Sequence, residues 1–186
     1  PVVVLSNNDG CIISRSNEAK KLGVEMAGPY FKAKPLIEKY DVAVFSSNYN
    51  LYGDLSWRVM ETLRILLGKN KVEVYSVDEA FLDLSIFPEN ELPAIAEKIK
   101  KIVETWTGIK VSVGVAPTKV LAKVANRLSK KYVQQYNGVM VLNSKEKIIA
   151  ALKQTEVGDI WGIGYQYAQK LKEQWSIYDA LQLSRM

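Results

Sequence analysis

Residues 72–84, VEVYSVDEAFLDL, carry two adjacent carboxylates between two apolar runs of strand type. Asp78 and Glu79 stand at the junction of these runs. Aspartate and glutamate are poor strand formers, and a charged group near the core of a sheet usually shifts its pKa, finds a partner or coordinates an ion. Both residues are therefore candidate ligands for a hard metal ion. The alternative is a polar hairpin tip, because aspartate is also a common turn residue.

The elements around this hairpin alternate between helices and strands. Apolar residues at helical spacing predict helices over 51–67 and 93–105. Strands are expected over 71–77, 80–84 and 109–115. One more strand before residue 51 would complete the order β-α-β-β-α-β, the split βαβ of ferredoxin-like domains. Residues 42–45 are the local candidate, but they fit equally well as the end of the preceding region. We therefore predict an α+β, ferredoxin-like sheet whose first strand is missing.

The N-terminal region is predicted to form a small α/β unit. Apolar runs at 2–5 and 11–14 flank an Asn/Asp-Gly turn at 6–10, a pattern typical of a β-hairpin. Two short helices are expected after it, over 16–23 and 31–39.

Past the hairpin, the chain is predicted to continue with an amphipathic helix over 118–131, a strand over 139–142 and a small helical segment over 143–186. The helix carries one stripe of basic residues, Lys119, Lys123, Arg127 and Lys130. Such a stripe is either a solvated face or a phosphate-binding surface. The predicted domains are 1–46, 47–142 and 143–186.

A glycine turn in the last segment is a second candidate for phosphate binding. Gly162, Ile163 and Gly164 precede a predicted helix over 165–175. Successive backbone N–H groups at such a turn can meet a phosphate at the N-terminus of a helix, as in helix-hairpin-helix DNA-binding elements. A plain interhelical turn is the alternative.

The composition limits the available chemistry. Among 186 residues there is no histidine and one cysteine, Cys11, which excludes an internal disulfide and a multi-cysteine zinc site. Without histidine, carboxylates and Mg²⁺ become the favoured option. The net charge of +5 permits binding to a polyanion without demonstrating it. Neither a membrane-spanning run nor a signal pattern is present, so we expect a cytoplasmic protein without membrane association.

Four segments together resemble the Y-family translesion DNA polymerases, and among them the UmuC (ImpB/MucB/SamB) type, that of the catalytic subunit of bacterial DNA polymerase V. They are PVVVLSNNDGC at 1–11, FSSNYNLY at 45–52, YSVDEAFLD at 75–83 and VGVAPTKVLAKVAN at 113–126. By this resemblance the three predicted domains correspond to fingers, palm and thumb.

The resemblance implies a DNA-directed DNA polymerase of the error-prone SOS damage response, which transfers a nucleotide from a dNTP to a primer 3′-hydroxyl with two Mg²⁺ ions. It assigns catalysis and metal binding to Asp78 and Glu79. The nucleotide-binding positions that it implies are Ser14, Asn17, Lys20, Tyr52 and Lys130. The implied DNA-binding positions are Gly162, Ile163, Gly164, Lys119 and Lys123.

Some of these positions depart from the family pattern. Better-known relatives carry tyrosine and arginine where this chain has Asn17 and Lys20, and a lysine lacks the bidentate fork of arginine. For Tyr52, the alternative to nucleotide binding is a structural role in the core. The chain also has no counterpart of the family's opening strand with its aspartate, of the aromatic residues that exclude ribonucleotides, or of the C-terminal DNA-gripping domain. We therefore expect little or no polymerase activity from this polypeptide alone.

The partners implied by the resemblance are primer–template DNA and dNTP and, in the intact protein, a UmuD-type accessory subunit, a recombinase filament and a sliding clamp. Two other functions are compatible with a palm-like topology. One is a non-catalytic module that binds DNA or a protein partner. The other is a nucleotide cyclase, which is disfavoured because the sequence has no Gly-Gly-Asp/Glu-Glu-Phe-like turn.

Overall fold

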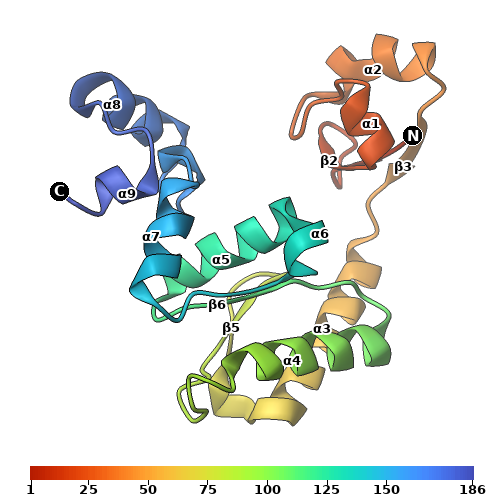
Figure 1. Cartoon of the computed structure of the whole chain (residues 1–186). Helices are drawn as coiled ribbons and strands as arrows, with labels where there is room; N and C mark the ends of the chain where they lie inside the picture. The colour runs from red at the N-terminus through yellow and green to blue at the C-terminus, as the bar shows by residue number, and fades with distance from the viewer. The chain divides into compact units, whose positions relative to one another are not determined.

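The structure is a computed structural model that describes residues 1–186, and the chain divides into two compact units (Figure 1). Unit 1 comprises Pro1–Asp54, and unit 2 comprises Leu55–Met186. The division falls inside helix α3, Tyr49–Leu67. The three-domain division at residues 46 and 142 stays a prediction.

Unit 1 is a three-stranded sheet with two helices. Its elements are β1 (Val2–Leu5), β2 (Ile12–Arg15), α1 (Asn17–Lys21), α2 (Tyr30–Lys39) and β3 (Ala43–Ser46). Strand β1 lies in the middle, antiparallel to β2 and parallel to β3. Strand β3 therefore belongs to the sheet of unit 1. Residues 42–45 thus end the N-terminal region and do not supply the first strand of the ferredoxin-like sheet.

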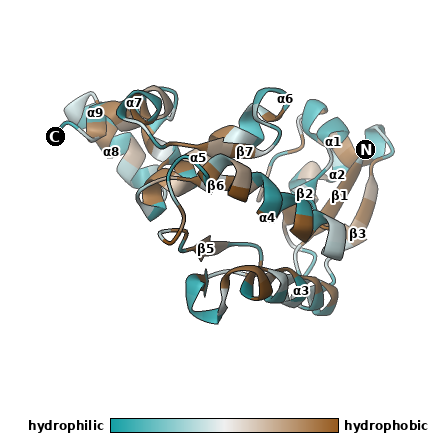
Figure 2. Cartoon of the chain, turned by 60° about the horizontal axis from the view of Figure 1, so that its bottom comes forward, coloured by the Kyte–Doolittle hydropathy of each residue, from teal (hydrophilic) through white to brown (hydrophobic).

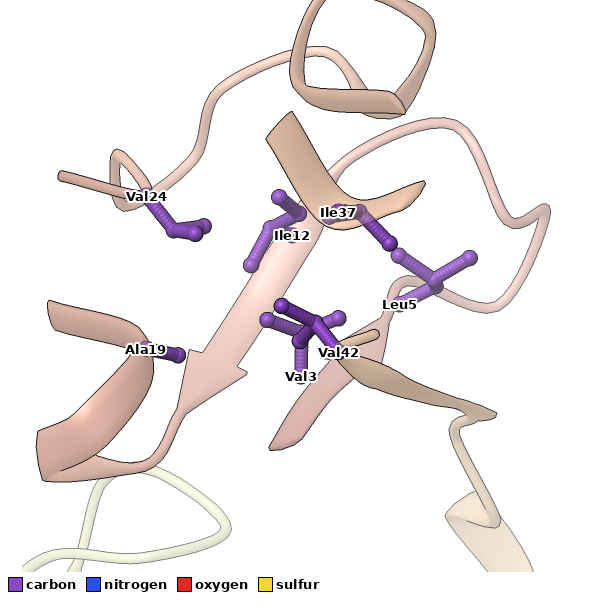
Figure 3. Packing of buried hydrophobic residues seen from close by; sticks show 7 residues of the cluster. All are labelled: Val3, Leu5, Ile12, Ala19, Val24, Ile37 and Val42. Carbon is purple, nitrogen blue, oxygen red and sulfur yellow. The ribbon is translucent and has the colours of Figure 1, made fainter. Parts of the chain in front are cut away.

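The core of unit 1 joins this sheet to both helices. Val3 and Leu5 are buried while Val2 and Val4 are less so, because successive side chains on a strand point to opposite faces. Figure 3 shows the seven buried side chains of this core, which are Val3, Leu5, Ile12, Ala19, Val24, Ile37 and Val42. Two of the four apolar residues at the N-terminus, Val3 and Leu5, thus belong to the core.

Unit 2 contains two separate pairs of strands. Strands β4 (Val72–Val74) and β5 (Ala80–Leu82) are antiparallel, whereas β6 (Val113–Val115) and β7 (Val139–Val141) are parallel. The predicted ferredoxin-like sheet would join the hairpin and β6 in one antiparallel sheet. No strand of the chain bridges the two pairs, because β3 pairs within unit 1. The α+β class is confirmed, and the sheet exists as two pieces.

Helices pack on both pairs of strands. They are α4 (Leu92–Thr107), α5 (Lys119–Lys131), α6 (Val133–Tyr136), α7 (Lys145–Lys153), α8 (Tyr165–Trp175) and α9 (Ala180–Leu183), with short 3₁₀ turns η1 (Lys69–Lys71) and η2 (Val157–Asp159). Helices α3 and α4 bury apolar side chains against β4 and β5, and α5 packs on β6. In Figure 2 the strands β6 and β7 are brown, as expected for buried strands, whereas α6 is largely teal. None of the helices combines the length and apolar character needed to cross a bilayer.

Glu104 anchors the segment that leads from α4 into β6. Its carboxylate pairs with Lys100 Nζ at 3.0 Å and accepts hydrogen bonds from Lys110 Nζ at 3.2 Å and the Val111 backbone N–H at 3.2 Å. Only 15% of the Glu104 side chain is exposed. Burial alone would raise the pKa of Glu104, but the hydrogen bonds from Lys100, Val111 and Lys110 hold it below its ordinary value of 4.5.

We expect the substitution Glu104→Gln to lower the free energy of unfolding by about 1–3 kcal/mol near neutral pH, because a neutral amide cannot balance two ammonium groups. A carboxyl group whose folded pKa is depressed stabilises the fold above its unfolded pKa, and this contribution is lost as pH falls through the folded pKa. The difference in the free energy of unfolding between wild type and variant should therefore shrink as the pH falls from about 7 to about 3. Urea unfolding at both pH values measures it, and an equal deficit at both would contradict the ion-pair explanation.

Candidate active site

The hairpin between β4 and β5 presents Asp78 and Glu79 outside regular strand geometry. The chain bends over residues 76–78, and the backbone N–H groups of Tyr75 and Ser76 both donate to the Glu79 carbonyl at 3.4 Å. Ser76 Oγ donates to Asp78 Oδ1 at 2.7 Å. Adjacent side chains of a regular strand point to opposite faces, so two neighbouring carboxylates need such a bend to serve one site.

Two donors hold the Glu79 carboxylate. Lys123 Nζ donates to Oε1, and Tyr75 Oη donates to Oε2 at 3.0 Å. Burial alone would lower the pKa of Lys123, but its hydrogen bonds with Glu79 and Tyr75 raise it above the ordinary value. The pKa of Tyr75 is also raised, chiefly by burial and further by Glu79. Both donors therefore keep their protons at neutral pH and fix the direction in which Glu79 points.

The pair of carboxylates fits a magnesium-type ion that keeps other ligands. Mg²⁺ is usually held by one or two carboxylates, and water and phosphate oxygens complete its octahedron. Nowhere in the chain do three or more Asp, Glu, His or Cys side chains gather into a group that could hold a metal. Two adjacent carboxylates would supply only part of such a shell, and metal binding by Asp78 and Glu79 stays a prediction.

The basic stripe on α5 faces carboxylates from other segments. Each pair joins residues far apart in the sequence: Lys119 with Glu73 of β4 at 2.6 Å, Lys123 with Glu79, and Arg127 with Asp159 of η2 at 2.5 Å. The pattern had indicated a solvated face or a phosphate-binding surface, and the half-exposed ion pairs of Lys119 and Arg127 are compatible with either. Exposed ion pairs contribute about 0–1 kcal/mol each, so their main effect is orientation. DNA binding by Lys119 and Lys123 stays a prediction, as does nucleotide binding by the exposed Lys130.

Three aromatic rings pack together next to Glu79, and one of them, Tyr75, donates to its carboxylate. Tyr75 and Phe81 stack with ring centroids 4.7 Å apart, and Trp161 lies 5.8 Å from Tyr75 and 5.5 Å from Phe81. Lys119 Nζ lies 5.1 Å from the centre of the Phe81 ring. No sequence pattern had pointed to these rings as part of the site. The available signal was the position of Tyr75 and Phe81 on either side of the acidic pair.

The glycine turn before α8 has the backbone geometry of a tight connection (Figure 1, between α7 and α8). Gly162 has a φ of 96°, a conformation that side chains rarely adopt. Ile163 packs against the buried cluster of Val157, Ala168 and Ile177, so its side chain is turned toward the core. Gly164 begins α8 without a side-chain cap, which leaves the first N–H groups of the helix without such a partner.

The nucleotide-binding residues predicted in the N-terminal region all belong to unit 1. Ser14 is exposed on β2, and Asn17 and Lys20 share α1, where Lys20 Nζ donates to Asn17 Oδ1 at 3.3 Å. Tyr52 lies on α3, half-buried, with its ring 5.8 Å from that of Tyr49. Their roles stay predictions.

We expect the substitution Lys123→Met to strengthen binding of Mn²⁺, used as a probe for Mg²⁺, by about fivefold to tenfold. The ammonium competes for Glu79 and repels a divalent cation at close range, an effect of about 1 kcal/mol or more in a solvated site. Titration followed by electron paramagnetic resonance measures free Mn²⁺. Lys119→Met is the matched control, because its partner Glu73 is not a candidate ligand. Weaker Mn²⁺ binding by the Lys123 variant would contradict the competition.

The chain is similar to known proteins both in sequence and in fold. The model of the impB/mucB/samB family matches residues 1–127. Protein UmuC of Salmonella typhimurium is 45% identical over 172 residues, which cover 92% of this chain and 40% of that protein. The crystal structure of DinB from Sulfolobus solfataricus matches with a TM-score of 0.80 at 28% identity, over 100% of this chain and 53% of that one. An insertion ternary complex of Dbh DNA polymerase matches with a TM-score of 0.78 at 30% identity, over 96% of this chain and 51% of that one.

The fold is therefore that of the Y-family DNA polymerases. The chain belongs to the impB/mucB/samB family, as the four sequence segments indicated. It spans about two fifths of the length of the curated relatives, 40% of UmuC and 43% of ImpB.

Proposed function

We propose that the chain is part of a DNA-directed DNA polymerase of the translesion type, which transfers a nucleotide from a dNTP to a primer 3′-hydroxyl. The observation that supports this most is the Asp78–Glu79 pair at a bent hairpin junction, with Glu79 held by Lys123 and Tyr75. A structural hairpin tip has no need for a carboxylate that is held from two sides. A nucleotidyl-transfer site needs such a carboxylate, because the position of a ligand sets the position of the ion.

In this proposal Asp78 and Glu79 hold Mg²⁺, with two ions in the working enzyme. Bound Mg²⁺ neutralises charge on the phosphates and orients the attacking and leaving oxygens. Tyr75 and Lys123 keep the Glu79 carboxylate in one orientation. The remaining predicted nucleotide contacts are Lys20 and Lys130 on the triphosphate, with Ser14, Asn17 and Tyr52 beside the nucleotide.

The proposed DNA contacts lie on the turn and on α5. The first backbone N–H groups of α8, which follow the Gly162–Gly164 turn, are suited to a DNA phosphate, because no side chain caps this end of the helix. Lys119 and Lys123 would add charge, and each must then share its ammonium between a carboxylate and the DNA. The further partners proposed for the whole protein are a UmuD-type subunit, a recombinase filament and a sliding clamp, in the bacterial cytoplasm during the SOS response.

A second candidate is a non-catalytic module that binds DNA. The observation in its favour is that no group of three or more Asp, Glu, His or Cys side chains in the chain could hold a metal. A polymerase site of the two-metal type uses a further ligand, which a binding module does not need.

Primer extension by the full-length protein that contains this chain distinguishes the two candidates. The assay uses labelled primer–template, dNTP and Mg²⁺, with intact and abasic templates. We expect extension on both templates, and binding with little extension from the 186-residue chain alone. Binding by the full-length protein without any extension would overturn the polymerase in favour of the binding module. Absence of DNA binding would contradict both.

A further inference from the structure

We propose that Trp161 is a positioning residue that holds the Gly162–Gly164 turn in a fixed relation to the Asp78–Glu79 hairpin. The inference rests on the proposed polymerase function, and it adds a role for a residue outside the metal ligands and the DNA contacts. Trp161 immediately precedes the turn, and its ring meets Phe81 at 5.5 Å and Tyr75 at 5.8 Å between centroids. Tilted ring pairs at these separations are attractive contacts.

The Trp161 side chain is directed to the hairpin and not to the core of its own segment. That core consists of Val157, Ala168 and Ile177, with Ile160, Ile163, Leu171 and Leu183 packed around it. Trp161 is 45% exposed and takes no part in this cluster. A tryptophan that was needed only to stabilise the segment would be expected inside the cluster, where its large apolar area is removed from water. Its contacts with Tyr75 and Phe81 call for another explanation.

One route leads from Trp161 directly to a metal ligand. The Tyr75 ring that contacts Trp161 also carries the hydroxyl that donates to Glu79 Oε2 at 3.0 Å. A swing of the Tyr75 side chain about its Cα–Cβ bond would move this hydroxyl. Phe81 and Trp161 pack against the ring and limit that swing. The position of the turn and the orientation of Glu79 are therefore coupled through one side chain.

A second route runs through α5 and starts from the same segment. Asp159 lies two residues before Trp161 and pairs with Arg127 of α5 at 2.5 Å. One helical turn earlier, Lys123 donates to the other oxygen of Glu79. Because residues four apart lie on one face of a helix, α5 connects Asp159 to Glu79 as a rigid rod. The two routes meet at one carboxylate, so the turn is held relative to Glu79 at two points.

This arrangement matters for a reaction between a DNA end and a metal-bound nucleotide. The turn would hold the duplex backbone, while the hairpin would hold the ions. A fixed distance between them delivers the primer 3′-hydroxyl to the reacting phosphorus, and small misplacements lower the rate of the chemical step more than they weaken binding. Trp161 is therefore expected to affect kcat and to leave the affinity for DNA nearly unchanged.

The ring contact is tested first in the 186-residue chain, without reference to catalysis. Phenylalanine replaces Trp57, Trp106 and Trp175, whose side chains are 58–61% exposed, so that Trp161 is the only fluorophore of its kind. Adding Tyr75→Ala should shift Trp161 emission to longer wavelength and increase its quenching by iodide about twofold, whereas Tyr75→Phe should leave both unchanged. Identical emission and quenching with alanine and with phenylalanine would overturn the contact.

The positioning role is tested by single-nucleotide incorporation in the full-length protein. We expect Trp161→Ala to lower kcat about tenfold, with KM for dNTP and Kd for DNA within about twofold. Trp161→Phe should restore most of the rate, because a ring remains on Tyr75. Trp175→Ala, at the other end of α8 and 60% exposed, should match wild type. A change confined to the Kd for DNA, no change at all, or an equal loss with phenylalanine would overturn the role. If the wild-type protein has no activity, that result counts against the proposed function. The fluorescence test of the ring contact does not depend on activity.

Discussion

Replacing Asp78 by alanine should abolish nucleotide incorporation by the full-length protein while leaving its affinity for primer–template DNA within about twofold. Asp78 lies in the bend of the hairpin, is exposed, and is held only by the neighbouring Ser76. Its loss removes half of the carboxylate set without touching a buried core. Because Asp78 is proposed as a direct ligand of the metal, its loss should lower the rate of incorporation by more than about a hundredfold. Single-nucleotide incorporation and fluorescence anisotropy with labelled DNA measure the two quantities.

The matched control is Glu73→Gln on the same hairpin. Glu73 is also exposed and also pairs with a lysine of α5, Lys119, but it lies on regular strand β4 and away from the bend. Both variants remove one negative charge, so general electrostatic effects cancel in the comparison. We expect incorporation by the Glu73 variant to stay within about threefold of wild type. Turnover retained by Asp78→Ala, or an equal loss in the control, would remove Asp78 from the catalytic site.

The acidic pair was recognisable from the sequence because its evidence is local. Two carboxylates between apolar strand runs conflict with strand propensity, and this conflict lies within residues 72–84. The helices were equally accessible, since periodicity is a local property, and α8 was predicted with its observed bounds of 165–175. Strand β3 was ambiguous, because its assignment depends on pairing with β1 about forty residues earlier, which no local pattern records.

The surroundings of the pair were not predictable for the same reason. Lys119 and Lys123 occupy a stripe that the sequence reveals, but their partners Glu73 and Glu79 lie 46 and 44 residues away. A charge pattern on one helix cannot tell a solvated face from one that is turned toward acidic strands. Trp161 likewise precedes a glycine turn, and the prediction of phosphate binding by that turn did not involve the tryptophan. These contacts depend on how α5 sits on β6, which a single glycine controls.

Gly114→Ala should be strongly destabilising, because β6 approaches α5 there without room for a side chain. A Cβ atom at Gly114 would lie 2.2 Å from the backbone nitrogen of Asn126 and 2.3 Å from the carbonyl oxygen of Ala122. Both are backbone atoms of α5, so no side chain can rotate away. Overpacking of a core by one methylene costs about 1–3 kcal/mol and occasionally more. We expect a loss of at least about 3 kcal/mol in the free energy of unfolding, measured by urea denaturation.

The opposite sign is expected for Gly53→Ala. Gly53 lies within α3, and a Cβ atom there would meet no atom within 4 Å. Alanine inside a helix is favoured over glycine by about 0.5–1 kcal/mol, so this variant should gain stability by that amount. The changes in the free energy of unfolding caused by Gly114→Ala and by Gly53→Ala should thus differ by about 4 kcal/mol. A loss below about 1 kcal/mol for Gly114→Ala would show that α5 can move away from β6 at little cost.

If Gly114→Ala remains folded, its structural consequence reaches the candidate site. The added methyl group can be accommodated only by moving α5 away from β6, and α5 carries the ammonium of Lys123 and the guanidinium of Arg127. Such a displacement loosens the Lys123–Glu79 and Arg127–Asp159 pairs together, because one helix bears both basic groups. Trp161 emission in the single-tryptophan chain should then shift to longer wavelength, as with Tyr75→Ala. An unchanged emission in a folded, destabilised variant would mean that the turn keeps its place without α5, and that Trp161 alone maintains the link to the hairpin.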